Sequence, residues 1–236
     1  MKRAFSIILL TLILVTTTVV FVACSGGVRN EKQWNDAMNY VKTCDTVTIS
    51  YEQEKTTNGR IYKIHDSKTL TIDVTKGLLY FSSISRTYNI LGSMTEQSSQ
   101  YQYVEVANTQ LTNYTKNVVN NSPTNWEETS HSYDSQDEAI QELRKIYESY
   151  IKQLGLDDFN YSDFSLKFGK YEKREVVNQK NTLWQLTFSN GKLDKAHFKT
   201  SHKKDSSDID HNKLNITVQY SAEISAPDGL NDAVRK

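Results

Sequence analysis

The chain has 236 residues with 28 basic and 28 acidic side chains, so its formal net charge is zero. A balanced charge offers no strongly basic face, and we therefore expect no nucleic-acid partner. With only 9 glycines and 2 prolines, the composition argues against a long disordered stalk or a string of linkers, and the length suits one domain.

The first 23 residues have the layout of an export signal. Lys2 and Arg3 precede an uncharged, apolar run over residues 4–23, and a basic start followed by an apolar stretch is typical of a secretory leader. The run is roughly 20 residues long, which is enough to span a bilayer as a helix. An uncleaved membrane anchor is therefore the competing interpretation, and an ordinary secreted protein is a third.

The residues FVAC at positions 21–24 resemble the lipobox of bacterial lipoproteins. The resemblance implies a signal peptide at residues 1–23, a diacylglycerol or palmitate-type lipid on Cys24, and a mature protein held on the extracytoplasmic side of the cell membrane. Phe21 departs from the aliphatic residue that is usual at the first position, so we expect less efficient cleavage. Residues 24–29, which include two glycines, are predicted to be a flexible tether. Cys44 is the only other cysteine, and we expect it to be a buried thiol without a disulfide.

A first helix is predicted from Asn30, the expected cap, with Gln33 reaching back to the helix start. Its apolar side chains recur at helical spacing and define one buried face: Trp34, Ala37, Met38 and Val41.

The sequence then changes to the period of two that is typical of half-buried strands. Apolar and polar residues alternate over residues 47–51, 70–74 and 101–106. Turns are predicted at Asn58-Gly59 and Lys76-Gly77, and residues 89–100 are expected to be a loop or a wide hairpin connection. This part of the chain predicts an antiparallel meander.

Residues 117–134 are polar, and they form the best internal boundary in the sequence. A second helix is predicted to follow, with Ser135 and Glu138 as a capping box and Gly155 as its end. Its apolar stripe consists of Ile140, Leu143, Tyr147, Tyr150 and Leu154.

The last third is predicted to return to strands. Residues 164–168 alternate, Asn190-Gly191 is the preferred pair for a type I′ hairpin turn, and residues 214–224 alternate without a break. We assign a single domain to residues 30–225 and a C-terminal tail to residues 226–236.

These elements predict an α+β fold in which a curved antiparallel sheet, an open half-barrel of about eight to ten strands, carries two amphipathic helices on its concave face. The order helix, meander, helix, meander suggests two similar halves, although no identity between them is visible. The element order resembles that of the periplasmic lipoprotein carriers and the lipid-binding lipoproteins related to them. Cystatin-like and NTF2-like sheets wrapped on a helix are the alternatives.

No catalytic or metal motif of the HExxH, Walker, GxSxG or CxxC type is present. The histidines and aspartates around residues 197–211 lack metal-ligand spacing and are expected to be solvated. We therefore predict no enzyme activity, no metal and no cofactor.

The resemblance and the aromatic content together suggest a protein that binds a hydrophobic or amphipathic ligand, such as a lipid, between helices and sheet. The side chains predicted to line that cavity are Trp34, Met38, Tyr147, Tyr150, Trp184 and Phe188. In the alternative interpretation these residues fill a packed core. The protein then binds another protein or a glycan through a sheet face rich in Tyr, Thr and Asn, and the sequence does not identify that partner.

Overall fold

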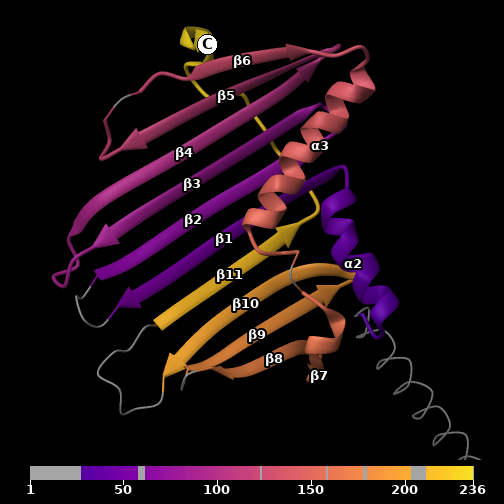
Figure 1. The fold of residues 1–236 in the computed structure, drawn as a ribbon, viewed down its shortest axis with the longest axis vertical. Coiled ribbons are helices and arrows are strands. Elements are labelled where there is room, and N and C mark those ends of the chain that lie inside the picture. The colour runs from indigo at the N-terminus through magenta and orange to yellow at the C-terminus, as the bar shows by residue number, and fades with distance from the viewer. Residues whose placement is uncertain are drawn as a thin grey trace, which may run out of the picture.

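A computed structural model describes residues 28–57, 62–122, 124–157, 159–177, 180–202 and 211–235. These residues form one open sheet of twelve strands with two α-helices on one face (Figure 1). The predicted α+β class with an open, almost wholly antiparallel sheet is confirmed. The proposed signal peptide, Cys24 and the Asn58-Gly59 turn lie outside the described residues.

Two antiparallel meanders make up the sheet. The first contains β1 (Thr46–Thr57), β2 (Tyr62–Asp73), β3 (Leu78–Tyr88), β4 (Met94–Ala107), β5 (Gln110–Val119) and β6 (Glu127–Ser132). The second contains β7 (Ser165–Lys167), β8 (Lys170–Val177), β9 (Lys180–Ser189), β10 (Lys192–His202) and β11 (His211–Gln219). Antiparallel pairing of β1 with β11 joins the two meanders into one sheet.

Both helices begin at the predicted caps. The side chain of Asn30 accepts a hydrogen bond from the backbone N–H of Gln33 at the start of α2 (Glu31–Thr43). The hydroxyl of Ser135 does the same for Glu138 at the start of α3 (Gln136–Gln153). In both caps the returning side chain reaches one residue further back than a capping box requires. Gln33 accepts from the N–H of Arg29 at 2.7 Å, and Glu138 accepts from the N–H of Asp134 at 3.2 Å.

Each helix packs mainly on strands of the other half of the chain. α2 precedes the first meander but lies against β10 and against the 3₁₀ turn η1 (Tyr161–Asp163). α3 precedes the second meander but lies over β3, β4 and β5 (Figure 1). The hydroxyl of Tyr147 on α3 donates to the backbone oxygen of Val41 on α2 at 2.5 Å and joins the two helices.

We call the side of the sheet that carries α2 and α3 the helix face. The predicted alternation places Val47, Ile49 and Tyr51 of β1 on this face, where all three are buried. The predicted hairpin turn is also present, with Asn190 and Gly191 both in left-handed conformations at φ +52° and +71° between β9 and β10. The apolar core lies between the helix face and the two helices.

The C-terminal segment covers part of the second face of the sheet. Side-chain exposure alternates as far as Ile224, as predicted, but the paired strand β11 ends at Gln219. The chain then passes behind the sheet (Figure 1) through η2 (Leu230–Asp232) and ends as β12 (Val234–Arg235), parallel to β6. The indole N–H of Trp126 donates to the backbone oxygen of Asp228 at 3.1 Å, and Trp126 is buried. The residues assigned to a tail therefore contribute a strand.

Twelve strands exceed the expected number because short or polar segments also pair. β4 begins at Met94, inside the predicted loop at 89–100, and β6 lies inside the polar segment 117–134. Neither segment has the apolar alternation of a half-buried strand. Backbone pairing does not require it where both faces of a strand meet water.

A buried carboxylate fixes the turn between β2 and β3. Asp73 accepts hydrogen bonds from the Thr75 hydroxyl at 2.7 Å and from the Lys76 N–H at 3.1 Å, and it pairs with the Lys76 ammonium at 3.2 Å. Burial alone would raise the pKa of Asp73, but these hydrogen bonds outweigh it and hold the pKa below its usual value. The turn is completed by Gly77 at φ +67°.

We expect Asp73→Asn to lower the free energy of unfolding at pH 7 by about 1 kcal/mol, because Lys76 is exposed and its ion pair is screened. A lowered pKa in the folded state contributes stability above the pKa of the unfolded chain and loses it as pH falls through the folded value. The difference in the free energy of unfolding between the parent protein and the variant should therefore shrink as pH falls below 3.8, the ordinary pKa of an Asp carboxyl. Urea denaturation at pH 7 and pH 3 measures it, and a gap independent of pH would contradict the assignment.

Candidate functional site

Four of the six predicted cavity residues lie on or beneath α2. Trp34 is 0% exposed and its ring lies 5.0–5.8 Å from four other aromatic rings: Tyr161, Phe164, Tyr171 and Phe188. Met38 is buried on the same helix. Trp184 on β9 is partly buried and joins this cluster through the ring of Phe159, which lies 5.0 Å away. The rings of this aromatic cluster pack on one another, and the indole N–H of Trp34 donates to the backbone oxygen of Phe159 at 3.3 Å.

The other two predicted residues lie on α3. Tyr147 is 0% exposed, and burial raises the pKa of its hydroxyl far above the ordinary value. The Tyr150 ring stacks on Phe81 of β3 with centroids 4.0 Å apart, and its hydroxyl contacts the side chain of Gln102 on β4. Burial raises the pKa of Tyr150 to about 12, so both tyrosines remain neutral and act as hydrogen-bond partners.

The helix face becomes polar where the helix cover ends. The Tyr51 hydroxyl donates to the Gln53 side chain at 2.6 Å, and Gln53 donates to Asn212 at 2.8 Å. On β2, Asp66 accepts from Ser85 at 2.6 Å and pairs with Lys55 at 3.4 Å. Figure 1 shows that α2 and α3 lie over one end of the strands only. The apolar core is thus bordered by a polar row that consists of these two hydrogen-bonded groups of side chains.

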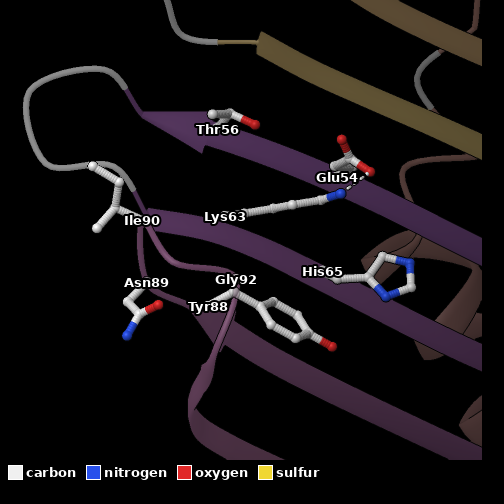
Figure 2. A pocket seen from close by; sticks show the side chains of 8 residues that line it. All are labelled: Glu54, Thr56, Lys63, His65, Tyr88, Asn89, Ile90 and Gly92. Atoms are coloured by element: carbon white, nitrogen blue, oxygen red, sulfur yellow. Dashed lines mark ion pairs between the residues drawn. The ribbon is translucent and has the colours of Figure 1, made fainter.

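A depression of about 510 Å³ lies on the second face, at the strand ends that the helices leave uncovered (Figure 2). Cross-strand pairing sets Glu54 opposite His65 and Thr56 opposite Lys63, so these side chains share the face that Tyr51 and Gln53 do not. The residues that line the depression are Glu54, Thr56, Lys63, His65, Tyr88, Asn89, Ile90 and Gly92.

One ion pair and one histidine–carboxylate contact organise this pocket. The Lys63 ammonium lies 2.9 Å from the Glu54 carboxylate, as Figure 2 shows, and His65 Nε2 lies 2.9 Å from the Glu52 carboxylate. Because these side chains are well exposed, the pairs contribute little to stability. They instead present charge and hydrogen-bonding groups beside the ring of Tyr88.

The loop between β3 and β4 forms one wall of the pocket, and the Asn89 side chain ties its backbone together. The Asn89 side-chain oxygen accepts from the N–H groups of Leu91 and Ser93, each at 3.0 Å, and Gly92 turns the chain at φ +77°. This order does not bury the loop's apolar side chains. Leu91 is 84% exposed, Ile90 is 64% exposed and Met94 is 47% exposed; we call these three residues the apolar tip.

A second depression, of about 370 Å³, lies on the same face at β9, β10 and β11. Its polar walls include Gln185, Lys195, His197 and Asn215, and His197 Nδ1 lies 2.7 Å from the Asn215 side-chain oxygen. It has no exposed apolar side chain comparable to the apolar tip.

Sequence reasoning placed residues 89–100 in a connection and did not identify the apolar tip. The available signal was the pair Ile90-Leu91 between polar neighbours in a turn. Two adjacent apolar residues in a loop bury neither side chain unless another element covers them.

No protein-family model matches this chain, and no curated protein matches it. Among the described residues, no helix is long and apolar enough to cross a membrane. The same part of the chain contains no group of His, Cys, Asp and Glu side chains that could hold a metal ion.

Proposed function

We propose that the protein is a membrane-anchored extracytoplasmic lipoprotein, lipidated at Cys24, that binds a protein partner through the apolar tip and the adjoining pocket. The observation that carries the proposal is the apolar tip itself. Backbone N–H groups of its loop donate hydrogen bonds to the Asn89 side-chain oxygen, while Ile90, Leu91 and Met94 remain exposed to solvent.

The chemistry of this surface suits a protein partner. Exposed apolar groups rimmed by polar residues mark sites of protein interaction, and the centres of such interfaces are enriched in Tyr, Met and apolar side chains. Here Tyr88 and the apolar tip would form the centre. The Lys63–Glu54 and His65–Glu52 pairs would form the polar rim and orient the partner.

The sequence of the leader supports the membrane anchor. A basic start, an apolar run and the lipobox-like FVAC precede Val28, where the described domain begins. Two or three acyl chains on Cys24, at ~0.8 kcal/mol for each buried methylene, would hold the domain on a bilayer durably.

A second candidate is a hydrophobic or amphipathic ligand, such as a lipid, held between the helices and the concave face of a half-barrel. The border between the apolar core and the polar row on the helix face favours it, because Tyr150 and Gln102 there combine an aromatic ring with hydrogen-bonding groups. Extraction of the purified protein and mass spectrometry of the extract tests this candidate. Recovery of a lipid in amounts equal to the protein would support it.

Replacing Cys24 by alanine tests the anchor. We expect the parent protein to fractionate with membranes at the mass of a cleaved, acylated chain. C24A should lose acylation and accumulate with its leader uncleaved. A parent protein that stays in membranes at its unprocessed mass would show that the leader is an uncleaved helix.

A photo-cross-linking side chain at position 91 tests the partner site in intact cells. Val176 on β8 is also a well-exposed apolar residue and is the matched control position. We expect a discrete protein adduct from position 91 that position 176 does not give, and we expect Ile90→Ser to reduce it at least tenfold. Equal labelling from both positions would contradict the proposal, and adducts with a glycan or a lipid alone would redirect it to that ligand.

A further inference from the structure

We propose that the β7–β8 hairpin lies on the membrane surface, with the Phe168 side chain in the lipid interface and Lys167 and Lys170 at anionic headgroups. This inference rests on the proposed anchor at Cys24. It assigns a role to a part of the fold that the partner site does not use.

The hairpin is tied to the start of the domain. The Tyr171 hydroxyl on β8 donates to the backbone oxygen of Val28 at 3.0 Å, and Val28 is buried. The four residue steps from Cys24 to Val28 reach at most about 14 Å even when fully extended. A lipid on Cys24 would therefore hold β8 close to the bilayer, and Figure 1 shows β7 and the start of α2 at the same end of the sheet.

A phenylalanine at position 168 is unfavourable for the turn that it occupies. Lys167 pairs with Lys170 across the hairpin, so Phe168 and Gly169 form a two-residue turn, and both have positive φ, at +49° and +77°. Such turns favour Asn, Asp or Gly at the first position, and a bulky residue with positive φ is strained. Phe168 is also 105% exposed, so it gains nothing from burial. A side chain that is both strained and fully exposed points to a role outside the fold.

The charges of the hairpin complement a lipid surface. Lys167 and Lys170 flank the aromatic ring and are exposed. The acidic side chains nearby have cationic partners outside the turn: Glu172 pairs with Arg174 at 3.0 Å, although it also interacts electrostatically with Lys167, and Asp163 and Glu175 both pair with Lys173. An aromatic ring between lysines is the combination found at membrane interfaces, and basic residues there are attracted to anionic lipids.

Fluorescent labelling of the full chain, reconstituted in vesicles of phosphatidylethanolamine and phosphatidylglycerol, tests the inference. Cys44 is buried, and burial raises the pKa of its thiol to about 11. An acylated Cys24 has no free thiol, so a cysteine introduced by Phe168→Cys would be labelled selectively. We expect a polarity-sensitive dye at position 168 to shift to the blue and to be quenched by spin-labelled lipid. The same dye at Leu91→Cys, on the apolar tip, should behave as it does in water. Equal behaviour at the two positions would overturn the inference.

The variant F168N removes the aromatic side chain and places at position 168 a residue that the turn favours. We expect its thermal midpoint to rise, because Asn tolerates a left-handed conformation. A dye at Leu166→Cys, beside the turn, should be blue-shifted on vesicles when Phe168 is present and should lose that shift in the F168N background. An undiminished blue shift would overturn the role of Phe168.

Mass spectrometry of the same reconstituted protein separates the two proposals. An unmodified Cys24 refutes the lipid anchor. A dye at position 168 that is still buried when labelling is repeated with Cys24→Ser, which removes the free thiol, then supports the hairpin contact. An acylated Cys24 with a solvent-exposed dye supports the anchor and refutes the hairpin contact.

Discussion

Replacing Trp34 by alanine is expected to lower the free energy of unfolding by about 3–5 kcal/mol, which is the usual cost of removing a large aromatic side chain from a core. Trp34 is fully buried, contacts four aromatic rings, and donates its indole N–H to the backbone oxygen of Phe159 at 3.3 Å. Its loss would leave a void that α2, packed against β10, closes only in part. Because whole domains have only about 5–15 kcal/mol of stability, much of the variant should be unfolded in mild denaturant.

Phe168→Ala is the matched control, because it also removes an aromatic side chain but from a fully exposed position. We expect its free energy of unfolding to stay within about 0.5 kcal/mol of that of the parent protein. Urea denaturation followed by circular dichroism measures both variants. A Trp34→Ala cost below 1 kcal/mol would contradict the packed aromatic cluster and would favour a ligand cavity beneath α2.

Deleting residues 226–236 is expected to lower the free energy of unfolding by about 1.5–3 kcal/mol, the range for uncovering one large apolar side chain. The deletion removes the backbone oxygen of Asp228 that accepts from Trp126, and it exposes the ring. It also removes β12, whose Val234 N–H donates to the Trp126 backbone oxygen at 2.8 Å.

A shorter deletion of residues 234–236 separates these two contributions, because it removes β12 and leaves Asp228 in place. We expect it to cost less than half as much as the longer deletion. Tryptophan fluorescence should shift to the red in the longer deletion only. If neither deletion changes the urea midpoint, the C-terminal segment does not stabilise the second face.

The elements that the sequence predicts well are those with a local physical signal. Asn30 and Ser135 act as caps through hydrogen bonds to residues only three positions later in the sequence. Asn190-Gly191 adopts the turn that its own backbone preferences favour. The alternation of apolar and polar residues along β1 could be read from the sequence because one face of this strand packs against the helices.

The parts that the sequence does not reveal depend on distant segments. Trp126 is buried by residues more than a hundred positions later, and no local pattern around either segment encodes that contact. Likewise, Trp34 and Tyr147 were predicted from their spacing, but their spacing is the same for a hollow and a packed interior. The apolar tip was missed because periodicity describes regular elements, and a loop has none.

The pairing of β1 with β11 has a consequence for how the protein reaches its native state. During synthesis the edge of Thr46–Thr57 has no neighbour on one side until residues 211–219 have been made, and an unpaired strand edge is a template for association with other chains. Pairings so distant in sequence also form slowly. Neither half buries its own helix, so a chain truncated within its second half should aggregate rather than persist as a stable half-protein.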